Sequence, residues 1–180
     1  MENIKMQERS FTVEDIMNLP EGVRMEVIDG NVYDMATPSP WHQQICVYFV
    51  RKIADHIDKK NGDCLVIPAP FGVFFQEDNN TYVEPDISVI CDKNKISERG
   101  CEGAPDWIVE IVSPSSRSMD YLHKLYLYKQ KGVRLYWIVD PVSQYVTVYD
   151  FEADIMKRYT FSDTIPVSIY DDLEIDMSKL

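Results

Sequence analysis

Two short segments each place a carboxylate where it could bind a metal ion. Asp86 opens the run Ile87–Ile90, and Glu110 stands within the run 106–112. Both carboxylates interrupt stretches of apolar, β-branched residues, where an uncompensated charge is costly to bury. A divalent cation would compensate both charges. We therefore expect Asp86 and Glu110 to lie on neighbouring strands and to face one shared pocket.

A pair of this kind is typical of metal-assisted hydrolysis. Mg²⁺ is usually held by one or two carboxylates together with waters and phosphate oxygens, and it can activate water and neutralise a phosphoryl oxygen. The alternative for Asp86 is an ordinary strand-start residue that follows Pro85 and caps local amides. Glu110 resists that explanation, because Glu is disfavoured in an interior strand and is rarely buried without a partner. Together the two residues favour a metal site.

Lys124 is the candidate for a cation that positions water or the scissile phosphate. Asp120 lies four residues before it, so the alternative is a surface Asp120–Lys124 ion pair of little energetic value. Glu26 makes a weaker candidate, because a hairpin strand can carry an outward-facing Glu without consequence. For His42 we favour packing at a helix start, or a hydrogen bond to a turn carbonyl, over metal ligation, since no nearby residues complete a metal-binding set.

The elements that must position these residues follow from hydrophobic periodicity and turn signals. Asp29-Gly30 predicts a hairpin between strands 24–28 and 31–35. Apolar residues at helical spacing from Ile45 to Ile57 predict a long amphipathic helix that ends near Gly62. The other expected elements are strands 86–90 and 106–112, a loop from Lys93 to Pro105, a helix from Ser115 or Ser116 to about Lys131 with Gly132 as its stop, and a hairpin from Leu135 to Tyr149. This order predicts a compact α/β domain with a mixed sheet.

Length and composition indicate one globular domain that spans residues 1–180. The chain has 180 residues, of which 45% are hydrophobic, enough for one good core. No run approaches the roughly 20 apolar residues that span a bilayer, and the N-terminus lacks the order of a signal peptide. We therefore expect a cytoplasmic protein without a membrane partner. The four cysteines show no C-x-x-C pairing and predict reduced thiols rather than a zinc site.

The net charge counts against one class of function. A formal charge of −12 disfavours loose, charge-driven binding to nucleic acid, because such binding depends on neutralising phosphates. The sequence also contains no nucleophile–His–Asp triad and no Gly-rich phosphate loop.

Several separated motifs, in order along nearly the whole chain, carry a family resemblance. They are Arg24–Gly30, Ser39–His42, Glu84–Asp86, Val109–Ser115, Asp120–Lys124 and Gly132–Pro141. In these motifs the chain resembles the Uma family of restriction-endonuclease-like bacterial proteins, a branch of the PD-(D/E)XK nuclease superfamily.

The resemblance implies a restriction-endonuclease-like core, in which a mixed β-sheet is flanked by helices and preceded by an N-terminal hairpin. It also implies a Mg²⁺-dependent endonuclease, with Mn²⁺ as a substitute, that hydrolyses DNA through a metal-activated water. Asp86 and Glu110 would be the metal ligands, and Glu26 a carboxylate near them. Val112 stands where the superfamily has its Lys, and the resemblance transfers that role to Lys124.

A second class of function stays open, namely a non-catalytic nucleic-acid- or protein-binding regulatory module that keeps the nuclease fold. The intact acidic positions and Lys124 favour the enzyme. The charge of −12 and the absence of a DNA-reading motif favour the module. DNA is the expected partner, and a homodimer is one assembly that either class could form.

Overall fold

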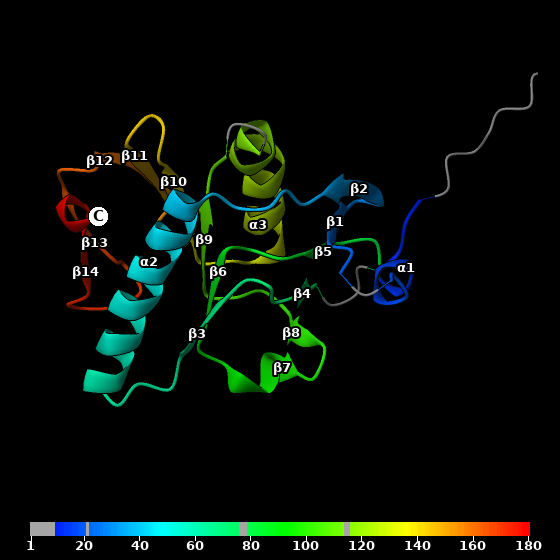
Figure 1. The fold of residues 1–180 in the computed structure, drawn as a ribbon. Helices are drawn as coiled ribbons and strands as arrows, with labels where there is room; N and C mark the ends of the chain where they lie inside the picture. The colour runs from blue at the N-terminus through cyan, green and yellow to red at the C-terminus, as the bar shows by residue number, and fades with distance from the viewer. Residues whose placement is uncertain (1–9, 21, 76–78, 114–115) are drawn as a thin grey trace, which may run out of the picture.

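The computed structural model describes residues 10–20, 22–75, 79–113 and 116–180, which form a mixed α/β fold (Figure 1). In these residues the strands form two six-stranded sheets and a small sheet of two strands. One of the large sheets combines parallel and antiparallel neighbours and has helices packed on both faces. The predicted α/β class with a mixed sheet is confirmed.

The sheet that contains Glu110 has the order β12-β11-β10-β9-β6-β3. Its strands are β3 (Leu65–Pro68), β6 (Ile87–Ile90), β9 (Trp107–Ile111), β10 (Leu135–Asp140), β11 (Tyr145–Asp150) and β12 (Ile155–Thr160). Strand β9 is parallel to β10 and antiparallel to β6. Both β9 and β10 are buried along their whole length, which explains why they read as nearly continuous apolar runs.

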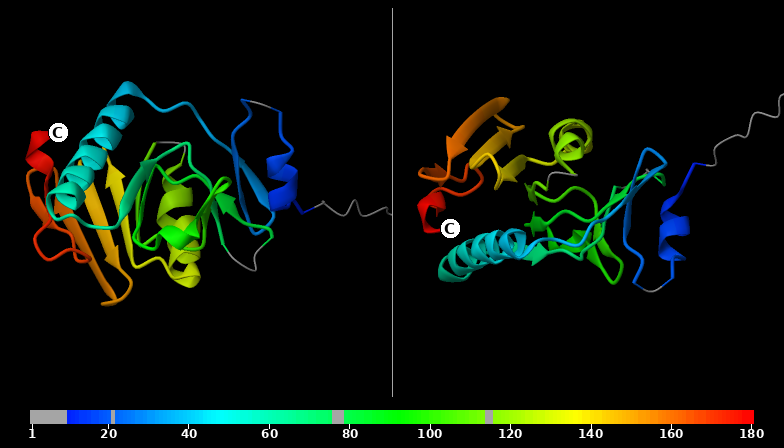
Figure 2. Two further views of the ribbon diagram at one scale, coloured as in Figure 1. Left: turned by 90° about the horizontal axis from the view of Figure 1, so that it is seen from below. Right: turned by 45° about the horizontal axis from the view of Figure 1, so that its top comes forward.

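Alternation along β9 sends its side chains into two different cores. Trp107 and Val109 belong to the core that includes the buried face of α2 (Pro40–Lys59). Ile108 belongs to the core that includes α3 (Leu125–Lys131). The two helices therefore cover opposite faces of the sheet (Figure 2). Glu110 is in phase with Ile108 and contacts the α3 side.

Helix α2 is the long amphipathic helix that the sequence predicts. Ser39 caps its N-terminus by accepting a hydrogen bond from the His42 N–H, and Pro40 suits the first helical position, where no N–H is needed. Its apolar residues at helical spacing are buried against the sheet. In the described ranges, no helix is both long and apolar enough to cross a membrane.

The helix predicted after β9 differs from expectation at its start. Of the two capping candidates, Ser115 lies outside the described residues, as does the neighbouring Pro114, and Ser116 precedes the first helical residue. Residues 117 and 118 are already helical, and η2 (Met119–Lys124), a π-helical segment, follows them and continues directly into α3. Gly132, with φ +87°, terminates α3 in the left-handed conformation, as predicted.

A second sheet, of order β2-β1-β5-β4-β8-β7, packs beside the first. Its strands are β1 (Met25–Ile28), β2 (Asn31–Asp34), β4 (Val73–Phe74), β5 (Tyr82–Val83), β7 (Ile96–Ser97) and β8 (Gly100–Glu102). The predicted hairpin is confirmed as β1–β2, with Asp29 and Gly30 at φ +50° and +77°. The loop predicted from Lys93 to Pro105 is wrong, because this segment holds the 3-10 helix η1 (Lys93–Lys95) and the β7–β8 pair.

The remaining elements lie at the two ends of the described chain. They are α1 (Val13–Met17), β13 (Thr164–Pro166), β14 (Glu174–Asp176) and η3 (Met177–Lys179). A capping box between Thr12 and Asp15 starts α1. At the other end, β13, β14 and η3 contribute buried side chains to the core beneath α2. This C-terminal contribution to the core was not predicted from the sequence.

The cysteines correct one expectation. Cys64 and Cys91 form a disulfide, whereas Cys46 and Cys101 are free and buried, as predicted for all four. The bonded pair flanks the antiparallel strands β3 and β6, in which Leu65 pairs with Ile90. Extending this register by one residue brings the two cysteines opposite each other. Their pairing therefore depends on strand register, which sequence spacing does not reveal.

Candidate active site

Asp86 and Glu110 lie next to each other on neighbouring chain segments. Asp86 immediately precedes β6, Glu110 belongs to β9, and the pairing of Ile87 with Val109 sets the two acidic residues side by side. The Asp86 N–H donates to Glu110 Oε2 over 3.3 Å. Both residues line one pocket of about 740 Å³, called the site pocket below. The expected proximity of the two carboxylates is confirmed.

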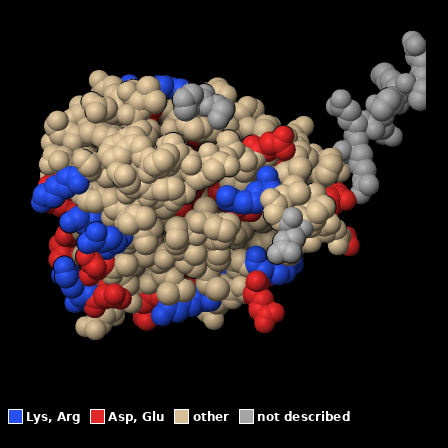
Figure 3. All heavy atoms as spheres, viewed as in Figure 1, with Lys and Arg blue, Asp and Glu red and all other residues tan. Residues whose placement is uncertain are grey.

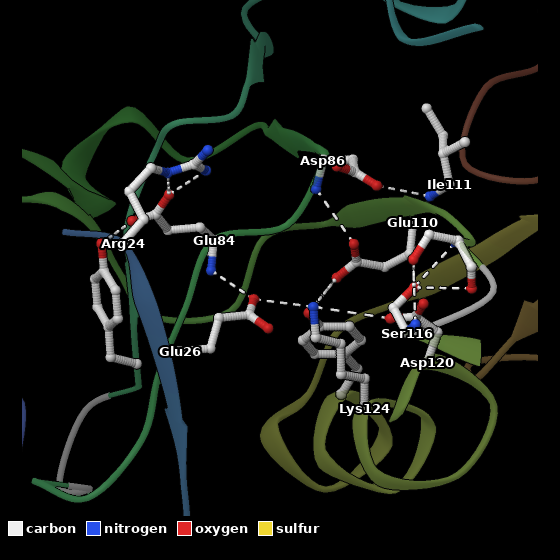
Figure 4. A network of polar contacts seen from close by, with 12 residues as sticks. Arg24, Glu26, Glu84, Asp86, Glu110, Ile111, Ser116, Asp120 and Lys124 are labelled. Carbon is white, nitrogen blue, oxygen red and sulfur yellow. Dashed lines mark hydrogen bonds and ion pairs between the residues drawn. The ribbon is translucent and has the colours of Figure 1, made fainter. Parts of the chain in front are cut away.

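The Asp86 carboxylate is held at one of its oxygens. Its Oδ2 accepts a hydrogen bond of 2.7 Å from the Ile111 N–H and lies 3.1 Å from His42 Nε2 (Figure 4 shows the first contact). Among the described residues nothing donates to the other oxygen, Oδ1. One oxygen therefore fixes the orientation of the side chain, and the second remains available to a ligand.

His42 performs a role that the sequence analysis did not assign to it. The residue lies in the first turn of α2, as expected, but its ring contacts the Asp86 carboxylate instead of a turn carbonyl. Burial opposes the charged imidazolium, yet the hydrogen bond and the negative charge of Asp86 together raise the pKa of His42. In this arrangement the side chain orients Asp86.

Lys124 is buried, and its ammonium group lies between carboxylates (Figure 4). Lys124 Nζ donates to Glu110 Oε1 over 2.8 Å and to Glu26 Oε1 over 2.9 Å, and it lies 3.8 Å from Asp120 Oδ1. The side chain is only 6% exposed. The alternative of a surface Asp120–Lys124 pair is therefore wrong, because Asp120 is buried as well.

Glu26 is an interior residue, which excludes the outward-facing alternative. It lies on β1 of the hairpin and is buried. Besides the contact with Lys124, its Oε1 accepts a hydrogen bond of 2.9 Å from the Glu84 N–H. The Glu84 side chain in turn accepts from Arg24 Nε over 2.9 Å and from the Tyr82 hydroxyl over 2.7 Å. The hairpin sheet thereby holds Glu26 against the site.

The buried cluster of Glu26, Glu110, Asp120 and Lys124 has three carboxyl groups for one ammonium. Burial raises the pKa of Glu110 despite the opposing charge of Lys124, and the neighbouring carboxylates raise it further. Burial likewise raises the pKa of Asp120 to about 6. For Lys124, burial opposes the charged form, but Glu110 and Glu26 raise its pKa overall. The cluster thus favours additional positive charge.

Tyr128 and Tyr136 are buried residues that also bind the polar cluster. The Tyr128 hydroxyl donates to Glu110 Oε1 over 2.8 Å, and the Tyr136 hydroxyl donates to the Asp120 carbonyl over 3.0 Å. The hydroxyl groups of these tyrosines were the sequence signal for a polar contact, because a buried Tyr usually finds a hydrogen-bond partner for its hydroxyl. The spacing of four residues between Lys124 and Tyr128 was a second signal.

A metal ion would fit between Asp86 and Glu110. Asp86 Oδ1 has no donor among the described residues. Burial raises the pKa of Glu110, Lys124 opposes the shift, and the nearby carboxylates add to it. No group of three or more His, Cys, Asp or Glu side chains suited to hold a metal occurs in the described ranges. The ion would therefore depend on two carboxylates, with water and phosphate oxygens as further ligands, which suits Mg²⁺.

Comparisons with known proteins show the family and the fold to which this chain is similar. Residues 13–178 match the model of the Uma2 family, described as "Putative restriction endonuclease". A Synechocystis sp. protein described as uncharacterized is 28% identical over 144 residues, which cover 78% of this chain and 74% of that protein. The crystal structure of a DUF820 protein from Anabaena variabilis, described as a putative nuclease, superposes with a TM-score of 0.77 at 23% identity. The alignment covers 93% of this chain and 96% of that one.

Proposed function

Because this chain belongs to the Uma2 family, described as putative restriction endonucleases, we propose that it hydrolyses DNA phosphodiester bonds with the help of Mg²⁺ or Mn²⁺. One observation carries this proposal. Two carboxylates from adjacent segments, Asp86 and Glu110, share a pocket with a buried lysine whose Nζ lies 2.8 Å from Glu110 Oε1. If Lys124 and Glu110 formed only a structural ion pair, the pair would not need Asp86 beside it with an oxygen free to bind a ligand.

The two carboxylates have the role of holding the metal ion. When bound, the ion would neutralise charge on the phosphoryl group and lower the pKa of a water molecule. Asp86 offers Oδ1, because Ile111 and His42 hold Oδ2. Glu110 offers Oε2, because Oε1 is bound by Lys124 and Tyr128, whereas among the described residues Oε2 accepts only a long hydrogen bond of 3.3 Å from the Asp86 N–H. Each residue thus has one carboxylate oxygen with capacity to bind a shared ion.

Lys124 positions the reacting groups. Its ammonium has three N–H donors, and two of them are directed at Glu110 and Glu26. The third can bind the attacking water or a non-bridging phosphate oxygen, where positive charge stabilises the transition state. Val112, two residues after Glu110, lines the same pocket but has no charge to contribute. Glu26 and Asp120 fix the ammonium from the other sides.

The non-catalytic module remains the second candidate, and one observation favours it. Six carboxyl groups that line the site pocket outnumber its basic side chains, so the pocket repels phosphate unless a cation is bound. Those acidic residues are Glu26, Asp34, Glu84, Asp86, Glu110 and Asp120. A binding module without metal would need a partner that lacks phosphate groups. Metal binding therefore separates the two candidates.

A cleavage assay tests the proposal. Plasmid and oligonucleotide DNA are incubated with the protein in Mg²⁺, in Mn²⁺ and in EDTA. We expect cleavage with either metal, none with EDTA, and a loss of at least a hundredfold in Asp86→Ala. Asp154→Asn is the matched control, because Asp154 has an 84% exposed side chain and pairs only with Lys129 among the described residues. Absence of metal-dependent cleavage on every DNA form would leave the binding module as the better account.

A further inference from the structure

The site pocket has an acidic floor and an apolar wall. The floor contains the carboxylates and Lys124, whereas the wall includes Met35, Pro38, Trp41, Pro141 and Val142. The apolar residues come from the segment that joins β2 to α2, from the first turn of α2 and from the turn between β10 and β11. Apolar side chains do not assist phosphate chemistry. They indicate that part of the substrate beside the reacting phosphate is itself apolar.

Trp41 is the main feature of this wall. It occupies the first turn of α2, next to His42, whose ring lies 3.1 Å from Asp86. Trp41 and the candidate metal ligand Asp86 line the same pocket. Trp41 is 39% exposed, although large aromatic side chains are usually buried. The other two tryptophans, Trp107 and Trp137, are fully buried at 0% exposure.

Charge argues against recognition of DNA through its backbone alone. Six acidic residues line the site pocket, namely Glu26, Asp34, Glu84, Asp86, Glu110 and Asp120. Its two basic residues, Arg24 and Lys124, are both engaged with carboxylates. On the face drawn in Figure 3, Lys and Arg form small groups interspersed with Asp and Glu, without the continuous basic track that a duplex backbone favours. Another part of the nucleotide must supply affinity.

An unpaired base can supply that affinity. Aromatic side chains bind single-stranded nucleic acid by stacking on its bases, largely without regard to sequence. In an intact duplex the faces of the bases are covered by their neighbours, and extruding a base costs a few kcal/mol. A volume of about 740 Å³ lies within the range of pockets that enclose a ligand of nucleotide size.

We propose that Trp41 stacks on an unpaired base adjacent to the scissile phosphate, so that the substrate is single-stranded or locally unpaired DNA and not intact duplex. This inference rests on the proposed function, because it assigns a substrate class to the same site. It predicts that the protein distinguishes single-stranded from duplex DNA by the accessibility of the base. The phosphate contacts are the same for both substrates.

Tryptophan fluorescence tests the inference directly. Because Trp107 and Trp137 are buried, quenching by an added ligand reports on Trp41. The protein is titrated, with Ca²⁺ in place of Mg²⁺ to limit cleavage, with a single-stranded oligonucleotide, the duplex of the same sequence, and an abasic strand with the same number of phosphates. We expect saturable quenching by the single strand, much weaker quenching by the duplex and none by the abasic strand.

Variants separate stacking from folding. Trp41→Ala should weaken binding of the single strand, measured by anisotropy of a labelled oligonucleotide, by about tenfold, and Trp41→Phe should retain most of the affinity. Tyr126→Ala is the matched control, because Tyr126 is 68% exposed on α3 and does not line the site pocket. Equal binding of the single, duplex and abasic strands, normal affinity in Trp41→Ala, or no quenching by any DNA would each overturn the inference.

Failure of this inference differs from failure of the proposed function. Cleavage of intact duplex without a fluorescence response would preserve the nuclease and remove the stacking role of Trp41. Quenching by single strands without cleavage in any metal would preserve the stacking role of Trp41 and remove the nuclease activity. The two measurements are made on the same protein, so each result is interpretable without the other.

Discussion

Lys124 Nζ lies 2.8 Å from Glu110 Oε1, although the lysine comes from the helical segment that follows the strand of the glutamate. Position 112, where the resemblance to PD-(D/E)XK nucleases would place a lysine, is a buried valine that lines the same pocket just after β9. A positive charge therefore lies beside the candidate metal ligand without the usual sequence spacing.

Replacement of Lys124 by Met should impair both stability and activity. Met keeps much of the packing of the lysine stem but leaves Glu26 and Glu110 without their cation. Loss of one partner from a buried ion pair costs about 3–5 kcal/mol, so we expect urea unfolding to show a decrease of this order. Single-turnover cleavage should fall by a factor of about 10² to 10³.

The control for this variant is Lys129→Met. The Lys129 ammonium is largely exposed and pairs with Asp154, and such a pair is worth little. Both stability and cleavage should stay close to those of the wild type. A Lys124→Met protein that unfolds and cleaves like Lys129→Met would show that the buried cluster has neither role.

Metal should stabilise the folded protein. A ligand that binds only the folded state raises the free energy of unfolding by mass action, and here it would also relieve repulsion between Asp86 and Glu110. We expect the melting temperature to rise with millimolar Mn²⁺ or Mg²⁺. The rise should be smaller in Asp86→Asn and unchanged in Asp154→Asn. Equal responses of all three proteins would contradict metal binding at Asp86.

The stability of the metal-free protein should depend on Asp120 in an unusual direction. Burial raises the pKa of Asp120 from 3.8 to about 6, even though Lys124 opposes the shift. Between these values the folded state binds more protons than the unfolded state, so this group favours folding more as the pH falls. The wild type should therefore gain stability relative to Asp120→Asn between pH 7 and pH 4.5. A difference in urea unfolding that is independent of pH would contradict this assignment.

His42 should control metal affinity through Asp86. Its ring contacts Asp86 Oδ2 at 3.1 Å, and loss of a group that orients a metal ligand typically weakens metal binding by about 10- to 100-fold. We expect this loss in His42→Ala, measured by Mn²⁺ titration with electron paramagnetic resonance. His123→Ala is the control, because His123 is exposed. Unchanged Mn²⁺ affinity in His42→Ala would reduce His42 to a packing residue.

The strands around the site were predictable, because their patterns are local. An acidic residue within a buried apolar run marks β9, and the Asp29-Gly30 turn marks the hairpin that presents Glu26. Asp86 and Glu110 could be paired on chemical grounds alone. The burial of Glu26 could not be predicted, because it depends on Glu84 and Lys124, which lie 58 and 98 residues away.

Other features depend on register and on helix geometry. Strand β8 pairs with β4, which precedes it by more than 20 residues, and so the segment read as a loop contains strands. The π-helical turn η2 changes which side chains face inward after β9. An ordinary helical pattern gave equal support to a buried and to a surface Lys124. Only the three-dimensional arrangement decides between them.

The most direct test of the central claim is the rate of single-turnover DNA cleavage as a function of Mn²⁺ concentration, for the wild type and for Glu110→Gln. Glu110 is the proposed metal ligand that also contacts Lys124. The account predicts no cleavage without metal, a rate in the wild type that rises and saturates with Mn²⁺, and a rate at least a hundredfold lower in Glu110→Gln. Cleavage by Glu110→Gln at the wild-type rate, or cleavage by the wild type that is independent of metal, would contradict it.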